Sequence, residues 1–195
     1  MRGKLAVGLI FGLALVGALA LAIVVRRGAT PLPIHGNLPD FNLIDQDGKP
    51  FGLEQLKGTA TVVDFFFTTC MGPCPMMAVE MGKLQTRFEA EPKLRFVSIS
   101  VDPRNDSTAA LRAYGESVGA KAGKWLFLTG DGDAITKLSE EGFMLAASTW
   151  PVGHSTKFVL VDKIGRIRGY YDSVDEKAMK DLVKDIGRLF RSNEG

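Results

Sequence analysis

The sequence predicts an α/β domain that follows an N-terminal membrane-spanning helix. Short apolar, β-prone runs alternate along the chain with stretches whose apolar residues recur at helical spacing. The only two cysteines, Cys70 and Cys74, lie between the end of one apolar run and the start of a helical pattern. Residues 5–25 contain neither a charge nor a proline. The remaining chain is long enough for one domain with a full core.

The apolar run at residues 5–25 predicts a membrane anchor. At about 1.5 Å of rise per residue, a helix of this length covers roughly 30 Å, the thickness of the hydrocarbon layer. A cleaved signal peptide is the alternative, because Ala18-Leu19-Ala20 resembles a cleavage site, but the run is longer than the apolar core of such peptides. We expect residues 1–27 to be an uncleaved anchor. The domain is then expected outside the cytoplasm, on the periplasmic face of a bacterial inner membrane.

Residues 28–39 are rich in proline and glycine, which predicts an extended linker between the anchor and the domain at residues 40–195. His35 lies in this linker and is expected to be solvated rather than to bind a metal.

The predicted elements follow in order from residue 40. We expect strands at residues 41–44, 50–53, 61–67, 94–101, 125–128, 157–161 and 166–171. We expect helices from Pro75, after a cap at Ser107, from Asp133, and around residues 179–189. The order β-α-β-α-β-α-β-β-α, with a dithiol after the first central strand, indicates a thioredoxin-like sheet. Parallel crossovers come first in it and an antiparallel hairpin last.

Charge argues against a nucleic-acid-binding surface. The formal net charge is +2, but residues 1–27 carry four basic residues and no acid, so the rest of the chain has a net charge of about −2. Its lysines and arginines are interspersed with acids, whereas nucleic-acid binding needs them clustered on one face.

The dithiol has several possible uses. A bridge between Cys70 and Cys74 would close a loop too small to stabilise the fold appreciably. A structural zinc site would need four closely paired ligands, and the chain has only two histidines, neither with a nearby partner. Pro75 suits the first helical position and places Cys74 at the cap, where the helix dipole favours a thiolate. A redox pair, a metal site and inert thiols are the other uses open to the two cysteines.

Two soft sulfurs favour Cu(I), and an added imidazole would allow the site to hold Cu(II) as well. His154 is the candidate third ligand, because the loop before the strand at residues 157–161 lies beside the cysteine loop in a thioredoxin-like sheet. On position alone, a histidine with an ordinary hydrogen bond fits equally well. Met71 is a candidate for an accessory contact or for docking a partner, whereas Met77 and Met81 fit the buried face of a helix.

Four local patterns together resemble the Sco/SenC family of copper chaperones, and they cover nearly all of residues 40–190. They are Asp47-Gly48 with Leu53 and Leu56-Lys57-Gly58; Phe67-x-x-Cys70-x-x-x-Cys74-Pro75; Ser98-Ile99-Ser100-Val101-Asp102-Pro103-x-x-Asp106; and His154-Ser155 before Phe158-Val159-Leu160-Val161-Asp162 and Gly165. The chain has Met71 where the family often has proline, and Gly153 where it commonly has an acidic residue. Asp102 and Asp106 match family positions and are expected to structure their loop.

The resemblance implies a membrane-anchored thioredoxin-like domain that holds one copper on Cys70, Cys74 and His154. It also implies a role in building the binuclear copper site of cytochrome c oxidase, with a copper donor protein and a copper-acceptor subunit as partners. The alternative function is a thiol–disulfide oxidoreductase that uses Cys70 and Cys74 to reduce the cysteines of a copper-acceptor protein.

Overall fold

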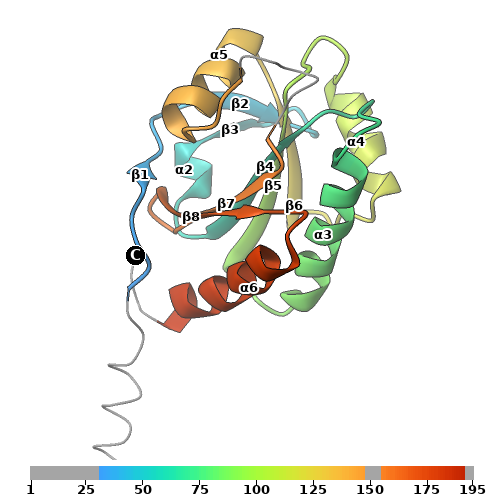
Figure 1. Cartoon of the computed structure of the whole chain (residues 1–195). Coiled ribbons are helices and arrows are strands. Elements are labelled where there is room, and N and C mark those ends of the chain that lie inside the picture. Colours follow the sequence, from blue (N-terminus) through green and yellow to red (C-terminus); the bar gives the residue numbers. More distant parts are fainter. Residues whose placement is uncertain (1–30, 148–154, 192–195) are drawn as a thin grey trace, which may run out of the picture.

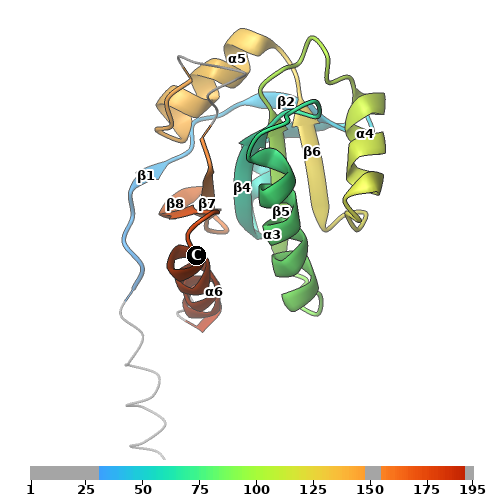
Figure 2. The same ribbon diagram turned by 45° about the vertical axis from the view of Figure 1, so that its right-hand side comes forward.

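A computed structural model describes residues 31–147 and 155–191 of the chain, and these residues form one mixed sheet with helices on both faces (Figures 1 and 2). The strands are β1 (Gly36–Asn37), β2 (Asn42–Asp45), β3 (Pro50–Gly52), β4 (Ala60–Phe66), β5 (Leu94–Ser100), β6 (Trp125–Thr129), β7 (Lys157–Val161) and β8 (Arg166–Asp172). The helical elements are α2 (Leu53–Leu56), α3 (Cys74–Arg87), α4 (Thr108–Ser117), α5 (Gly132–Lys137), the π-turn η1 (Leu138–Gly142) and α6 (Glu176–Arg191). The strand order is β1-β8-β7-β4-β5-β6-β2-β3.

Strand β4 lies at the centre of the sheet and is buried at every position, as expected for a nearly continuous apolar run. It pairs in parallel with β5 and antiparallel with β7, while β5 pairs in parallel with β6. Strands β7 and β8 form the antiparallel hairpin. The predicted α/β, thioredoxin-like arrangement of parallel crossovers and a closing hairpin is therefore confirmed.

Side chains of β4 alternate between two hydrophobic cores. Val62 and Phe66 pack in a core with residues of α3, α4 and α6. Val63 and Phe65 pack in the opposite core, to which α2, α5 and strands β2 and β3 contribute. The cysteine loop leaves β4 at its carboxyl end and enters α3, so it lies at the edge of the first of these cores.

The described part of the predicted linker, residues 31–39, packs onto the domain. Strand β1 pairs with the edge strand β8. Leu32 is buried, and the buried guanidinium of Arg168 donates hydrogen bonds to the carbonyl oxygens of Leu32 (2.6 Å) and Pro33 (3.1 Å). A buried guanidinium needs hydrogen-bond acceptors, and an edge strand has backbone groups without a partner strand. This segment supplies the acceptors to Arg168 and a partner strand to β8. His35 is exposed, as expected.

Three local details differ from the prediction. The short helix α2 and the π-turn η1 were not foreseen, because four or five residues carry too little periodicity. Helix α5 begins at Gly132, since the side chain of Asp131 caps it by accepting from the amide of Ala134. Cys74 is the first residue of α3 rather than its cap.

In residues 31–147 and 155–191, none of the helices combines the length and the apolar character needed to cross a bilayer. The expected anchor at residues 1–27 lies outside the described residues.

Candidate metal centre

The cysteine loop places its two thiols together between β4 and α3. The amide of Cys70 donates to the carbonyl oxygen of Phe67 at 3.2 Å, which turns the chain at the end of the strand. No disulfide joins the two cysteines in the structure, and the Cys74 thiol hydrogen-bonds with that of Cys70. Cys74 is buried in the core, whereas Cys70 is half-buried. The described chain therefore places two thiols together, with Cys74 buried and Cys70 half-buried.

Burial decides the charge state of the inner thiol. Burial raises the pKa of Cys74, and its hydrogen bond with Cys70 raises it further, while a hydrogen bond with the backbone of Phe67 lowers it. Burial therefore outweighs the helix N-terminus, contrary to the expectation of a Cys74 thiolate. The dipole effect is limited to the first turn and is smaller than the cost of burying an unpaired charge. A bound soft cation would supply the missing positive charge next to the sulfur.

Asp106 fastens the cysteine loop to the neighbouring strand. Its buried carboxylate accepts hydrogen bonds from the amide of Thr68 (3.1 Å), from the Thr68 hydroxyl and from the Ser100 hydroxyl at the end of β5. The Asp102 carboxylate accepts from the side-chain amide of Asn105 at 2.7 Å. The expectation that Asp102 and Asp106 structure their own loop, residues 102–106, is confirmed. The dithiol is thus held at the ends of two adjacent strands.

Asp64 is a buried carboxylate that the sequence reasoning missed. It shares a face of β4 with Val62 and Phe66, which belong to the core that contains Cys74. Burial raises the pKa of Asp64 to about 7, although a hydrogen bond with Ser98 opposes the increase. Its Oδ1 atom has no hydrogen-bond partner among the described residues. The sequence signal that could have identified Asp64 is an acidic residue inside an otherwise apolar strand.

The methionines near the loop divide into two groups. Met77 and Met81 are buried, which confirms that they pack in the core. Met71 lies between the cysteines and is 98% exposed, and Met76 is 61% exposed. The thioether sulfurs of Met71 and Met76, which are soft ligands, are therefore accessible beside the dithiol.

His154, the predicted third ligand, lies outside the described residues. The chain resumes at Ser155 and enters β7, which runs antiparallel to β4. The start of β7 therefore lies at the carboxyl end of β4, the end that carries the cysteine loop. Within the described part of the chain, no group of three or more His, Cys, Asp or Glu side chains could hold a metal ion. The structure thus places Cys70 and Cys74 together, and the assignment of His154 stays a prediction.

Comparison with known proteins identifies relatives of the whole described domain. A family model described as SCO1/SenC matches residues 35–191. A SCO1/SenC family lipoprotein from Bacillus anthracis is 36% identical in sequence, and its structure superposes with a TM-score of 0.74 over 81% of this chain and 97% of that one.

Two further structures are similar. BsSco, a member of the Sco family of cytochrome c oxidase assembly proteins in which a disulfide switch was identified, is 29% identical, with a TM-score of 0.74 over 84% of this chain and 99% of that one. Copper-bound ScoI from Bradyrhizobium japonicum is 26% identical, with a TM-score of 0.64 over 76% and 98% of the two chains. The family model spans the strand, dithiol loop and helix described above, and the chain belongs to the SCO1/SenC family.

Proposed function

We propose that this protein is a membrane-anchored copper chaperone that binds copper through Cys70, Cys74 and His154 and assists assembly of the binuclear copper site of cytochrome c oxidase. The observation that carries the proposal is the pair of adjacent, hydrogen-bonded thiols at the carboxyl end of β4 in a chain of the SCO1/SenC family. The copper-bound ScoI structure and the description of BsSco as an assembly protein support it. Copper is the cargo, delivered by a donor protein and passed to an acceptor subunit of the oxidase.

The chemistry of the donor set fits copper in both oxidation states. Two thiolates suit Cu(I), which accepts low coordination, whereas Cu(II) prefers more donors, including nitrogen. Cys70 is the more accessible thiol and would meet the incoming ion first. Cys74 would then lose its proton as it ligates, because only a thiolate binds the metal.

In this proposal residues 1–27 anchor the chain and leave the domain outside the cytoplasm, on the periplasmic face of a bacterial inner membrane. The similarity to a family lipoprotein supports attachment to a membrane.

A second candidate function is thiol–disulfide exchange with the cysteines of a copper-acceptor protein. The specific observation in its favour is the hydrogen-bonded pair of thiols, with Cys70 accessible and Cys74 buried as the resolving group. The disulfide switch identified in BsSco is consistent with such chemistry. Both functions use the sulfurs of Cys70 and Cys74, so a molecule that holds copper cannot exchange disulfides at the same time.

His154→Ala separates the two functions. We expect the affinity for Cu(II) to fall at least about 100-fold, since loss of even an outer partner of a metal ligand costs 10–100-fold. Affinity for Cu(I) should change by less than about tenfold, because two thiolates satisfy that ion. The thiolate-to-Cu(II) absorption and competition with a Cu(I) chelator measure the two affinities, and disulfide-reductase activity is followed in parallel. His35→Ala, at the other histidine, is the matched control. An unchanged Cu(II) spectrum in His154→Ala would make His154 an ordinary loop residue and favour the reductase.

Mild oxidation should release the metal. Two thiolates lose two electrons to the oxidant and form one S–S bond, so neither sulfur keeps the charge that binds copper. We expect free thiols to fall from about two to about zero per chain as bound copper is lost. Thiol trapping with mass spectrometry and metal analysis of the same samples measure both quantities. Copper retained at full affinity by the Cys70–Cys74 disulfide form would disprove shared ligation.

A further inference from the structure

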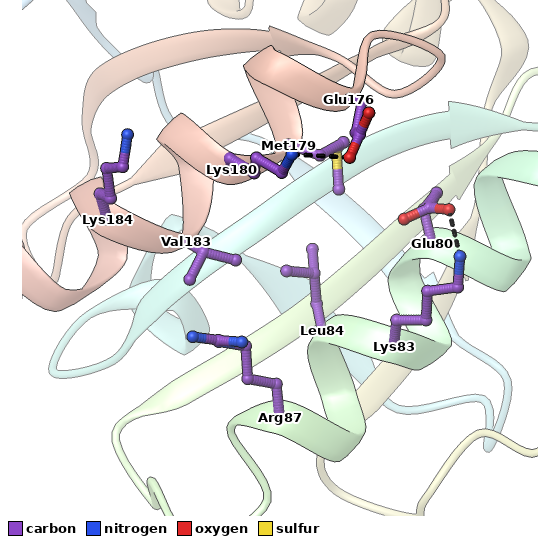
Figure 3. A pocket seen from close by; sticks show the side chains of 9 residues that line it. All are labelled: Glu80, Lys83, Leu84, Arg87, Glu176, Met179, Lys180, Val183 and Lys184. Atoms are coloured by element: carbon purple, nitrogen blue, oxygen red, sulfur yellow. Dashed lines mark hydrogen bonds and ion pairs between the residues drawn. The ribbon is translucent and has the colours of Figure 1, made fainter.

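A groove separates α3 from α6 on one face of the sheet, away from the cysteine loop. The two helices lie side by side, and Figure 3 shows the side chains that line the space between them. The volume of this open groove is about 490 Å³. Leu84 of α3 and Met179 and Val183 of α6 line it with apolar surface. The groove therefore offers an apolar floor between two helices.

Cations dominate the two walls of this groove. Four basic and two acidic residues line it, so the lining carries a net charge of +2. They are Lys83, Arg87, Lys180 and Lys184, with Glu80 and Glu176.

The acidic residues neutralise only part of this charge. Lys83 pairs with Glu80 at 2.7 Å and Lys180 with Glu176 at 2.6 Å, and both lysines stay mostly exposed. Lys184 contacts Asp181 at 3.0 Å, outside the lining. Arg87 forms no ion pair with any residue that the structure describes. Exposed pairs of this kind are weak and exchange readily, so the cations remain available to an anionic ligand.

The described chain begins beside α6. Leu32 packs in the same core cluster as Leu182, Ile186 and Leu189 of that helix, and Figures 1 and 2 show the start of the described segment on the same side of the domain as α6. The apolar run of the sequence ends at Val25, six residues before Pro31. Even fully extended, six residues span no more than about 20 Å. A bilayer that contained this run would therefore lie close to the face formed by α6.

We infer that the α3–α6 groove binds the anionic phospholipid headgroups of the membrane to which the chain is anchored. This inference rests on the anchor in the proposed function. Lysine and arginine stems would lie on the apolar floor while their charged ends reach the lipid phosphates. Each cation held near an anionic surface increases binding about fivefold, and the tether keeps the surface within reach.

Binding at this groove would also orient the dithiol. Cys74 and Arg87 are the first and last residues of α3, a separation of about 20 Å along the helix axis. The cysteine loop thus lies at the end of α3 opposite to Arg87. An acidic segment of a partner protein could meet the same charges, but the short connection to the apolar run favours lipid.

Protection of the groove lysines from an amine-reactive reagent tests the inference. The full chain is incorporated into nanodiscs of phosphatidylcholine alone or of equal parts phosphatidylcholine and phosphatidylglycerol. Mass spectrometry then gives the modification rates of Lys83, Lys180 and Lys184, with Lys137 as an internal reference of similar exposure. We expect the groove lysines to react at least about threefold more slowly in the anionic discs, and Lys137 to react equally in both. The protection should disappear in about 0.5 M sodium chloride, where charges are screened beyond about 4 Å.

The double variant Arg87→Glu, Lys184→Glu should abolish the protection of Lys83 and Lys180 in anionic discs. The double variant Lys49→Glu, Lys137→Glu also reverses two charges at exposed sites and is the matched control. It should retain the protection of Lys83 and Lys180. Equal reaction in both kinds of disc would overturn the lipid assignment, leaving an acidic protein segment as the ligand that fits the groove. If the chain does not insert into the discs, residues 1–27 are not a membrane anchor. The inference depends on that anchor and would then be wrong as well. Copper content, measured on the same samples, reports separately on the metal site.

Discussion

A chain in which Cys70 and Cys74 are both replaced by serine is expected to lose copper binding, from about one ion per chain to about none. A serine hydroxyl is a hard donor that keeps its proton at neutral pH, so it cannot replace a thiolate as a ligand for Cu(I). Metal analysis after dialysis against a weak chelator measures the stoichiometry. Stoichiometric, tight copper in the double variant would place the site elsewhere in the chain.

The two single variants show whether a loss reflects the metal site or the fold. Cys74 is buried in the core, so a hydroxyl there costs on the order of 1–3 kcal/mol if it finds no partner. Cys70 is half-buried at the loop, and its replacement should leave the unfolding midpoint nearly unchanged. We expect Cys70→Ser to lose tight copper while it remains as stable as the parent. Thr69→Ser, at an exposed residue of the same loop, is the control that leaves both thiols in place.

Asp64→Asn is expected to flatten the pH dependence of stability. Burial raises the pKa of Asp64 from 3.8 to about 7, so the folded protein holds the proton more tightly than the unfolded chain does. The stability that Asp64 contributes should be fully present below about pH 4 and should be lost as pH rises from about 4 to about 7. The difference of about three pKa units corresponds to a loss on the order of 4 kcal/mol. Asparagine cannot ionise, so this loss should vanish in the variant.

Urea unfolding of the reduced protein at several pH values between about 5 and about 8 measures this effect. The buried amide of asparagine adds a cost of its own, but that cost does not vary with pH, so the slope is the informative quantity. Asp133→Asn, at an exposed carboxylate in α5, is the control and should keep the parent slope. Parallel slopes for the parent and Asp64→Asn would mean that Asp64 does not ionise in this range in the folded state.

Local periodicity was sufficient to predict most of the fold. The strands at residues 61–67 and 94–101 correspond to β4 and β5, and the hairpin near residues 157–171 corresponds to β7 and β8. Each of these predictions depends on apolar residues that repeat within a few positions, which is information the local sequence contains. The position of the dithiol between a central strand and a helix followed from the same patterns.

The properties of the metal centre depend on contacts between distant segments. Asp106 holds Thr68 across 38 positions of sequence, and Ser98 meets Asp64 from a neighbouring strand. The burial that keeps Cys74 protonated comes from the core beneath α3, and no local rule predicts its depth. The sequence could name these residues, but their partners were fixed only by the packing of the sheet.

The sequence by itself determined the order of the helices and strands, the position of the two cysteines and the family to which the chain belongs. These features are encoded in local periodicity and in the identity of a few side chains. The tertiary structure alone decided that residues 31–39 pack on the domain, that Cys74 is buried while Cys70 stays accessible, and that α3 and α6 form a basic groove. The physical reason is that burial and electrostatic environment arise where segments far apart in the chain meet, and the strength of each interaction depends on the water that this packing excludes.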